Sequence, residues 1–570
     1  MANNKFSFTK PSETIEIHLS NGQSITGPRG APVAEFMELA QSQYEDQIVG
    51  AVINGELREL VYPIQKESDV VPVTVAMPDG MRIYRRTLTF LLGFAFRKLF
   101  PGADIKIDHS VSFGGYYCEV ENRHALSEDE ISALKNLMDE IISENGEIIR
   151  KEVPIKDAIK YFINTNQPDK VKLLKHRKKD FIMLHFYGDY CDYHHGYMLP
   201  SSGGVKLFDI QNLGEGFALR FPRRHNPNVL MPLGDYPKLI ATFRQYGDWL
   251  ERLGIDSVGA LNDTIQDGRI RETILVSEAL HEQRIVDIAT RIADRRDEIR
   301  VVLVAGPSSS GKTTSSRRLS VQLLAYGIHP YPLEMDNFFV DRDRTPRDKR
   351  GEFDFEHIDA INIPRLNHDL KKLISAEEVQ LPHYDFHTGI SGPGEVVKLQ
   401  PGQVIIVEGI HGLNPKLISE VPESQIYRVY LSALTQLNFD RHNRVSTTDT
   451  RLIRRIVRDA RTRGYSPQET IRRWESVRRG EKQNIFPYQE NANVLFNSAL
   501  VYELAALKPM AEPLLRQVPF GTPEHIEVKR LLAILDWFLP LDTSLIPDNS
   551  LLREFIGGSI LEDFSLWKNE

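Results

Sequence analysis

The alternation of apolar and polar positions predicts a small α/β unit at the front of the chain. Apolar and polar side chains alternate over Thr14–Leu19, as in a half-buried strand, and an Asn21-Gly22 turn follows. The spacing over Val33–Gln41 is helical. A second strand pair around the Asn54-Gly55 turn signal then completes a unit that we place at residues 1–75.

A second mixed pattern follows. Leu88–Lys98 is a strongly apolar helical stretch that Pro101-Gly102 ends, and Gly114-Gly115 precedes the strand-like run YYCEV. We therefore expect a domain of helices and strands over residues 76–240.

From Ser277 the pattern becomes that of a protein with a parallel sheet. A long amphipathic helix begins at Ser277 and leads into Val301–Ala305, an apolar run without a polar residue. Val404–Val407 is a second such run. Continuous apolar strands are typical of parallel sheets that helices cover on both faces.

The length agrees with several domains, since 570 residues at about one domain per ~150 give three or four. The divisions that we expect are residues 1–75, residues 76–240, a linker at 241–276, the parallel-sheet domain at 277–510, and a C-terminal helical extension at 511–570 that contains an apolar helix at Ile526–Phe538.

Composition is that of an ordinary folded protein, with 41% apolar and 26% charged residues. The two cysteines, Cys118 and Cys191, allow at most one disulfide, which favours a reducing compartment. Met1–Lys10 lacks the apolar core of a signal peptide, and no apolar stretch approaches the ~20 residues that cross a bilayer. We therefore expect a cytoplasmic protein with no membrane partner.

One segment carries a nucleotide-binding signature. Directly after Val301–Ala305, GPSSSGKT matches G-x-x-x-x-G-K-[ST], and an amphipathic helix follows, as this phosphate-binding loop requires. Glycines let backbone amides close on phosphates, and the helix N-terminus favours negative charge. The residues expected to bind ATP are Gly306, Pro307, Ser308, Ser309, Ser310, Gly311, Lys312, Thr313 and Thr314.

Magnesium and the reacting phosphate need further groups. Lys312 is expected to reach the β- and γ-phosphates, and Thr313 to offer a hydroxyl to Mg²⁺. Glu408 ends the strand Val404–Val407, where a parallel sheet would bring its carboxylate to the same metal ion. ATP and Mg²⁺ are therefore the predicted cofactors.

A carboxylate also follows the next predicted strand. Tyr331–Met335 ends at Asp336, which would lie across from the loop and could accept a proton from an attacking hydroxyl. Asp354 and Glu356 follow in the loop KRGEFDFEHIDA, and Tyr384 lies in LPHYDF. Carboxylates suit paired sugar hydroxyls and aromatic rings suit a base, but a structural role is equally consistent with any single one of these carboxylates.

Charge is unevenly distributed. The net charge of −8, from 70 Lys and Arg against 78 Asp and Glu, argues against non-specific binding of nucleic acid. Residues 441–482 nevertheless contain twelve Arg and one Lys against five acidic residues. A helix is predicted over Asp449–Arg463, with Arg451, Arg455 and Arg458 roughly on one face. Arginine binds phosphate in a bidentate manner, so this helix is expected to form a lid that neutralises a transferring phosphoryl group.

Six motifs in order, GPSSSGKTT, MDNFF, FDFEHIDA, LPHYDF, VEGIHGLN and DTRLIRRIVRDARTRG, resemble the uridine/cytidine kinase group of the phosphoribulokinase-like P-loop kinases, over about Ser277 to Lys508. The resemblance implies that Asp336 deprotonates a nucleoside 5′-hydroxyl. It implies catalytic roles for Asp336, Lys312, Arg455 and Arg458, an ATP contact by Arg463, and substrate contacts by Asp336, Phe339, Asp354, Glu356, Tyr384 and Arg455.

Some positions depart from that family. In the animal enzymes a His follows Tyr-Asp-Phe by three positions and helps to read the pyrimidine, but here that position is Gly389, with His387 two residues earlier. A lid arginine expected just past Gly464 is Tyr465. Phosphoryl transfer is therefore better supported than the choice of base, and adenosine or another hydroxylated acceptor stays open. The ribose carboxylate is Asp354 or Glu356, depending on alignment.

The front of the chain resembles two other domains. NGQSITGPRGAP and VINGELREL resemble a TGS domain, a β-grasp-like unit found in threonyl-tRNA synthetases. FLLGFAFRKLFPGADIKI, GGYYCEV and LSEDEISALKNLMDEII are similar to the editing domain of those synthetases. The resulting fold class is α/β, a P-loop kinase with a parallel sheet flanked by helices, preceded by two smaller α+β domains.

The metal ligands of the editing family are incomplete here. That family uses two His four apart on the helix, where this chain has Arg86 and Phe90, and a Cys and a His four apart, which Cys191 and His195 retain. Two ligands do not complete a zinc site, so we expect no editing activity. Whether the cluster with His194 takes a metal stays open.

Two functions follow. The first is ATP-dependent phosphorylation of a nucleoside, uridine- or cytidine-like, with the nucleoside and ATP as partners. The second is an RNA- or tRNA-sensing regulatory ATPase whose N-terminal domains bind RNA or a regulatory ligand. The sequence leaves open whether the chain forms a homo-oligomer.

Overall fold

The computed structural model describes residues 10–111, 113–234, 236–348 and 351–562. The chain forms two compact units: unit 1 contains Met1–Asp235, Asn438–Arg444 and Pro519–Ile526, and unit 2 contains Tyr236–Leu437, Val445–Val518 and Glu527–Glu570. Nearly all of Met1–Lys10, the first two residues of the predicted substrate loop (Lys349 and Arg350) and the last eight residues of the C-terminal extension lie outside the described residues.

Unit 1 begins with a five-stranded sheet in the order β2-β1-β5-β3-β4. Helix α1 (Val33–Gln41) buries Val33, Phe36, Met37 and Ala40, a spacing of three and four residues that puts all four on one face. The strand predicted at Thr14–Leu19 and the helix predicted at Val33–Gln41 are confirmed. The strands are β1 (Thr14–Leu19), β2 (Ser24–Pro28), β3 (Ile48–Ile53), β4 (Glu56–Arg58) and β5 (Ser68–Thr74).

Helix α2 (Pro78–Leu99) is central to the rest of unit 1, because Leu88, Phe90, Leu91 and Leu92 are all fully buried. It packs against α3 (Glu128–Glu144) and β6. One antiparallel sheet contains β6 (Asp104–Val111), β7 (Gly115–Glu121), β11 (Asp209–Asn212) and β12 (Gly216–Arg220). A second antiparallel sheet contains β8 (Ile149–Pro154), β9 (Phe181–Tyr187) and β10 (Tyr190–Asp192). Two helices, α4 (Ile155–Asn164) and α5 (Pro168–Lys175), accompany this second sheet.

Unit 2 is built on a five-stranded parallel sheet in the order β14-β17-β13-β18-β19. Val304 of β13 and Glu334 of β14 both lie opposite Glu408 of β17, so the carboxyl ends of these strands meet at one edge. The predicted parallel sheet flanked by helices is therefore confirmed. The strands are β13 (Val301–Ala305), β14 (Pro330–Glu334), β17 (Val404–Gly409), β18 (Ile426–Ser432) and β19 (Val494–Asn497).

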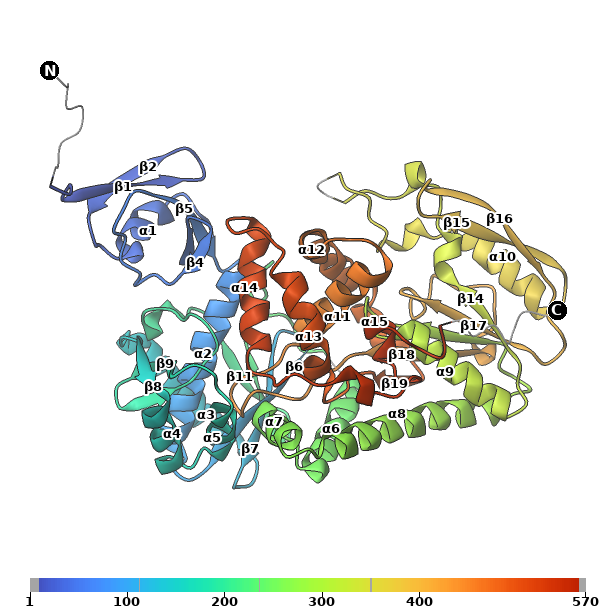
Figure 1. Cartoon of the computed structure of the whole chain (residues 1–570), viewed down its shortest axis with the longest axis horizontal. Coiled ribbons are helices and arrows are strands. Elements are labelled where there is room, and N and C mark those ends of the chain that lie inside the picture. The colour runs from blue at the N-terminus through green and yellow to red at the C-terminus, as the bar shows by residue number, and fades with distance from the viewer. Residues whose placement is uncertain (1–9, 112, 235, 349–350, 563–570) are drawn as a thin grey trace, which may run out of the picture. The chain divides into compact units, whose positions relative to one another are not determined.

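Helices lie along this sheet, and α8 (Ile270–Ala293) packs on α9 (Lys312–Ala325), as Figure 1 shows. Helix α8 begins seven residues before the predicted Ser277, because Ile270, Thr273 and Ile274 extend its buried face after the turn at Gly268. The segment that we predicted as a linker is helical, with α6 (Pro237–Leu253) and α7 (Val258–Gln266).

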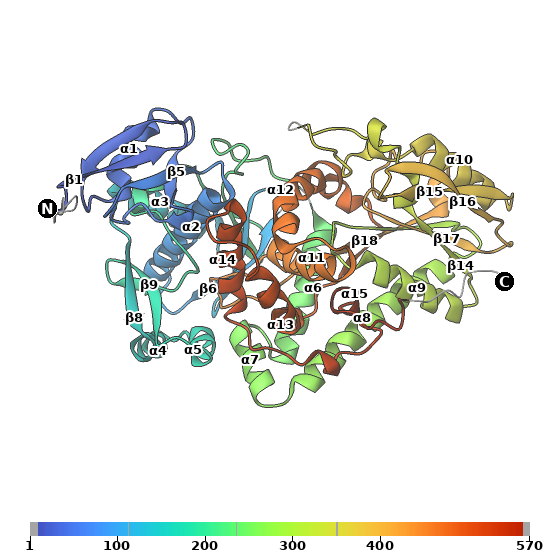
Figure 2. The same cartoon turned by 45° about the horizontal axis from the view of Figure 1, so that its top comes forward.

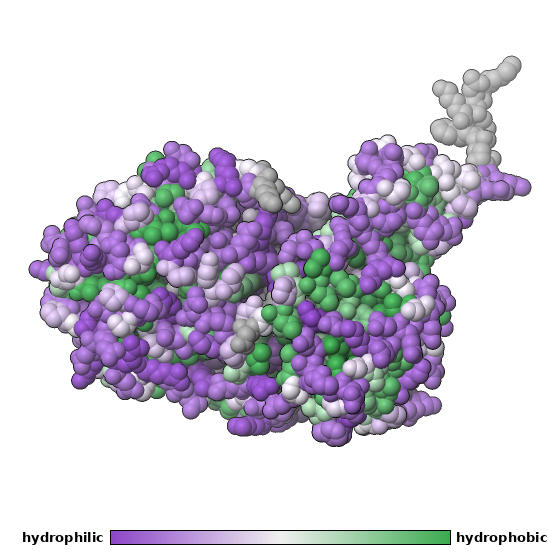
Figure 3. Space-filling view, turned by 180° about the vertical axis from the view of Figure 1, so that it is seen from behind, coloured by the Kyte–Doolittle hydropathy of each residue, from purple (hydrophilic) through white to green (hydrophobic). Residues whose placement is uncertain are grey.

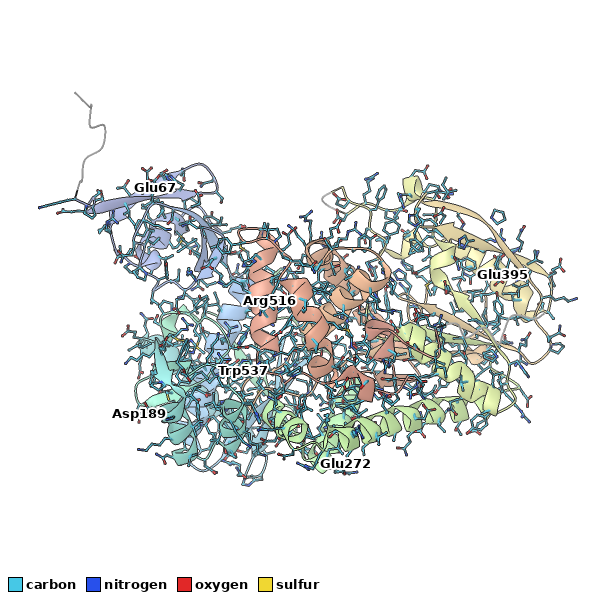
Figure 4. All side chains as sticks on the ribbon, in the orientation of Figure 1. Glu67, Asp189, Glu272, Glu395, Arg516 and Trp537 are labelled. Atoms are coloured by element: carbon cyan, nitrogen blue, oxygen red, sulfur yellow. The ribbon has the colours of Figure 1, made fainter. Side chains whose placement is uncertain are left out.

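A hairpin extends unit 2 beside the edge strand β14. It consists of β15 (Val379–Asp385) and β16 (Ile390–Val397), and α10 (Ile363–Ile374) packs against β15 (Figure 2). The Tyr331 hydroxyl on β14 donates a 2.6 Å hydrogen bond to the carboxylate of Glu395, which is labelled in Figure 4. This bond ties the hairpin to the edge of the parallel sheet.

The C-terminal part of the described chain is largely helical. Helix α11 packs against α12, α13 and α15. The apolar helix expected at Ile526–Phe538 is α14, which begins earlier because Pro523 suits the first helical turn. The bounds are α11 (Thr447–Thr462), α12 (Pro467–Asn484), α13 (Glu503–Leu515), α14 (Pro523–Leu535) and α15 (Arg553–Ile556).

Within the described part of the chain, no helix combines the length and the apolar character that a membrane span needs. The face drawn in Figure 3 is mostly hydrophilic, with apolar side chains in dispersed patches. Cys118 and Cys191 are both buried and free.

Candidate active site

The predicted phosphate loop joins β13 to α9. Gly311 is the N-cap of α9 with a φ of +88°, in the left-handed region where glycine has no steric penalty. A Cβ at Gly306 would lie 2.1 Å from the carbonyl oxygen of Leu431, so a side chain there would collide with β18, the neighbour of β13 in the sheet. Glycine at these two positions is thus a requirement of the backbone path, and the first amides of α9 point out of the helix end, where they can bind an anion.

Lys312, Thr313 and Glu408 come together as predicted. The Lys312 ammonium donates to the carbonyl of Pro307 at 3.3 Å, and the Thr313 hydroxyl donates to the Glu408 carboxylate at 2.8 Å. Burial lowers the pKa of Lys312, an effect that the charges of Glu408, Glu554 and Asp336 oppose. A hydroxyl beside a carboxylate is a hard oxygen pair of the kind that Mg²⁺ prefers, so these residues fit the predicted ion.

Asp336 lies in the turn Met335–Phe338 directly after β14. Neighbouring protein atoms partly desolvate the Asp336 carboxyl and raise its pKa, and the positive charges of Lys312 and Arg463 oppose that rise. Asp336, the predicted base, therefore interacts electrostatically with Lys312 of the loop and with Arg463, the last arginine of the predicted lid. The side chain itself is accessible to solvent, which leaves its carboxylate open to an incoming hydroxyl.

Glu356, one of two alternatives for the ribose carboxylate, interacts electrostatically with Lys312 and Asp336. Burial and the negative charge of Glu481 raise its pKa to about 7, against the opposing charges of Arg455 and Lys312. One of its carboxylate oxygens is buried and accepts no hydrogen bond from the described residues. Asp354, the other alternative, accepts from the Glu356 amide at 3.1 Å and so shapes the loop.

Aromatic side chains gather beside the acceptor side of the site. The ring of Phe339 packs 5.5 Å from those of Phe355 and Tyr384, and the ring of Tyr384 packs 5.0 Å from that of Phe386. A cavity of about 340 Å³ lies between Phe339 and the β15–β16 hairpin. Tyr384 itself is buried, and its hydroxyl has no partner among the described residues.

Gly389, where the sequence departs from the kinase family, has a structural explanation. It adopts a φ of +74°, and a Cβ there would lie 2.6 Å from the Arg342 guanidinium. That guanidinium donates to the carbonyls of Phe386 and His387. An arginine from a distant loop therefore occupies the space beside Gly389, a feature without a local signal in the sequence.

The arginines of α11 have different roles. The Arg455 guanidinium donates to the Ser308 hydroxyl at 2.9 Å, so it contacts the phosphate loop. Arg451 also reaches this loop, donating to the Ser308 carbonyl at 2.8 Å, but it is fully buried. Arg458 binds Asp459 at 2.7 Å, and Arg463 lies 3.8 Å from the same carboxylate.

Two buried groups that the sequence did not predict join α11 and α12 to the phosphate loop. The Glu481 carboxylate accepts from the Ser308 amide at 3.1 Å and is paired with Arg451 and Arg478. Arg454, also fully buried, pairs with Glu503 and donates to the Ser309 carbonyl at 3.4 Å. Helical spacing shows which residues share a face, but only the fold shows which face is buried.

The cysteine and histidine cluster in unit 1 differs from the predicted one. Among the described residues, the group with ligand atoms within 4.8 Å of one another is Asp192, His194 and His442. The Lys170 ammonium lies 2.9 Å from Asp192 and 3.1 Å from the His442 ring nitrogen, so a cation of the protein itself already lies there.

The two positions where the editing family carries its helix histidines also have other roles. The Arg86 guanidinium donates to the Tyr197 carbonyl. The Phe90 ring packs edge-on at 5.7 Å from His194. Cys191 is buried, which raises its pKa to about 11 and disfavours the thiolate that binds metals.

Comparison with known proteins gives different relatives for different parts of the chain. Residues 301–504 match the Phosphoribulokinase / Uridine kinase family. The threonine–tRNA ligase of Clostridium kluyveri is 30% identical over 205 residues, which are 36% of this chain and 32% of that protein. The chain thus spans about a third of the length of the curated relatives it matches.

Two solved structures are similar to parts of the chain. D-glycerate 3-kinase from Cryptococcus neoformans is 16% identical with a TM-score of 0.21, covering 48% of this chain and 87% of that one. A protein described as a possible uridine kinase from Bacillus stearothermophilus is 24% identical with a TM-score of 0.20, covering 25% of this chain and 80% of that one.

The C-terminal half of the chain therefore contains a domain of the phosphoribulokinase/uridine kinase family with a P-loop kinase fold. The N-terminal region is threonyl-tRNA ligase-like.

The raised pKa of Glu356 predicts a pH-dependent stability. Between its ordinary value of 4.5 and about 7, the folded protein holds a proton that the unfolded chain has lost, so stability falls as pH rises through this window. We expect Glu356→Gln to stabilise the fold by about 1–2 kcal/mol at pH 8, after allowing for solvent screening, and to change little at pH 5. Thermal unfolding at both pH values tests this, with exposed Glu352→Gln as the matched control, and equal shifts at pH 5 and pH 8 would contradict it.

Glu408 predicts a pH-dependent affinity for magnesium. Burial raises its pKa to about 7, so protons compete with Mg²⁺ for this carboxylate near neutrality. We expect Mg²⁺-dependent ADP binding to tighten about tenfold between pH 6 and pH 8, and Glu408→Gln to lose that dependence. Calorimetric titrations of ADP with and without Mg²⁺ measure both effects. The same pH dependence in the variant would exclude Glu408 as the titrating ligand.

Proposed function

We propose that this chain is an ATP-dependent kinase that transfers a phosphoryl group to the 5′-hydroxyl of a nucleoside, uridine- or cytidine-like. The observation that carries the proposal is that Asp336 follows directly after β14, at the same edge of the parallel sheet as Glu408 and the start of the P-loop. A phosphate-binding loop alone is equally consistent with a GTPase or a motor ATPase. A carboxylate beside it that is open to solvent supplies the base that an alcohol acceptor needs.

The roles of the chain's own groups follow from their positions. Asp336 accepts the proton of the attacking hydroxyl. Lys312 and Arg455 neutralise negative charge that develops on the transferring phosphoryl group, as loop lysines and lid arginines do in this chemistry. Thr313 and Glu408 would hold Mg²⁺, which would supply positive charge to offset that of the phosphates.

The acceptor is proposed from the remaining groups. The free carboxylate oxygen of Glu356 can accept from a ribose hydroxyl, and Phe339 with the neighbouring aromatic rings offers a surface for a base. The match to a family that includes uridine kinase supports a pyrimidine nucleoside.

Asp336→Asn tests the general base. The variant keeps the shape of the side chain but cannot accept a proton, so we expect unchanged ATP binding and a kcat lowered by about 10²–10⁴. The exposed Glu334→Gln, two residues earlier, is the control and should turn over normally, whereas Lys312→Ala should weaken both ATP binding and turnover. Undiminished turnover in Asp336→Asn would remove this residue from the mechanism.

Removal of the ribose hydroxyls tests Glu356. Uridine and 2′,3′-dideoxyuridine both carry the reacting 5′-hydroxyl, but only uridine can donate to Glu356. We expect the wild type to prefer uridine by about 10–100-fold in kcat/KM and Glu356→Gln to lose most of this preference. Initial rates of ADP release with each nucleoside measure it, and an unchanged preference in the variant would assign the ribose contact elsewhere.

A second function has one observation in its favour. The threonyl-tRNA ligase-like region exposes lysines on and after α4 and α5, namely Lys156, Lys160, Lys172, Lys178 and Lys179, and such a basic surface suits RNA. An RNA-sensing ATPase would hydrolyse ATP faster with RNA and respond to no nucleoside. ATP hydrolysis with RNA and with a nucleoside panel therefore decides between the two functions.

A further inference from the structure

The C-terminal segment lies against the phosphate loop, within unit 2. The Glu554 carboxylate on α15 accepts from the Thr314 amide at 3.3 Å and from the Thr314 hydroxyl at 3.1 Å. Leu551 packs so closely on Gly311 that a Cβ there would lie 2.7 Å from its methyl carbon. The segment thus covers the turn where the loop becomes helix α9.

That turn is where a bound phosphate would be expected. Thr314 is the third residue of α9, so its amide has no carbonyl partner within the helix and is one of the free donors at the helix N-terminus. Such donors, with the positive end of the helix dipole, bind phosphate. A carboxylate oxygen has the charge and the acceptor capacity of a phosphate oxygen, and Glu554 uses these donors in that way.

The charge of Glu554 also reaches the catalytic groups. Burial lowers the pKa of Lys312 and raises that of Glu408, and the negative charge of Glu554 opposes the first shift and adds to the second. A nucleotide phosphate at Thr314 would therefore meet a like charge and an occupied pair of donors, and both effects oppose its binding.

Glu554 differs from Glu481, the other carboxylate on the loop. Glu481 is fully buried and bound by two guanidiniums, so its displacement would leave buried charges unpaired. Glu554 is half-buried and forms no ion pair with the described residues; its side-chain hydrogen bonds are the two to Thr314. Leu552 and Phe555 are fully buried and anchor the segment, so loss of the two Glu554 bonds would loosen the segment without detaching it.

We propose that Glu554 is an internal competitor of the nucleotide, a carboxylate that occupies the phosphate position at Thr314 and must be displaced when ATP or ADP binds. The proposal rests on the proposed nucleotide site and adds its regulation. Because coupling between two binding events is reciprocal, any partner or modification that holds the C-terminal segment away raises nucleotide affinity, and nucleotide binding loosens that segment.

ADP binding without Mg²⁺ tests the competition directly. We expect Glu554→Ala to bind ADP about tenfold more tightly than the wild type, and Glu554→Gln, which keeps an acceptor but loses the charge, to lie between them. Glu562→Gln is the matched control, because Glu562 belongs to the same segment but its carboxylate lies 3.8 Å from Arg461 and makes no hydrogen bond to the loop among the described residues. Unchanged or weaker ADP binding in Glu554→Ala would overturn the proposal.

Hydrogen exchange of residues 548–558 supplies a readout that does not depend on affinity. In the wild type, ADP should speed exchange in this segment because it displaces Glu554, and in Glu554→Ala the segment should already exchange fast and respond little. Slower exchange with ADP would mean that the segment clamps the nucleotide, which would overturn the proposal. If ADP affinity rises in Glu554→Ala but no nucleoside is phosphorylated, the kinase function fails and the competition stands.

Discussion

The carboxylate of Glu481 accepts a hydrogen bond from the Ser308 amide while two guanidiniums, those of Arg451 and Arg478, close on it from α11 and α12. Burial alone would raise the pKa of Glu481, but the two positive charges outweigh burial and hold it below its ordinary value. The buried group therefore stays charged. Loss of one partner from a buried ion pair typically costs about 3–5 kcal/mol, so this arrangement fixes the lid helices to the phosphate loop.

The rest of the site depends on this rigid centre. Glu481 also faces Glu356, and the like charge helps to keep the proton on Glu356 near neutrality. Glu408 and Asp336 likewise have raised pKa values, chiefly because the surrounding protein desolvates their carboxyl groups. Carboxylates with raised pKa values are suited to a site that binds a metal ion, because the positive charge of the ion favours their ionised form.

Unit 1 shows how a family's local pattern can be replaced by another network. Phe90, which stands where the editing family has a histidine, packs on His194. The Lys170 ammonium contacts both Asp192 and His442. His442 comes from the stretch Asn438–Arg444, which lies shortly before α11 in sequence but packs with unit 1. The chain passes directly from this stretch of unit 1 into α11 of unit 2.

What the sequence determined by itself is local. Val301–Ala305, the glycines of the loop and the helix at Val33–Gln41 could be predicted because periodicity and turn chemistry act over a few residues. Asp336, Glu408 and the loop could be placed at one edge because parallel strands align their carboxyl ends. The tertiary structure alone decided which arginines of α11 are buried and that Glu481 and Glu554 lie on the loop. These contacts join residues 30 to 240 positions apart, and no periodic or motif signal reports a pairing at such a separation.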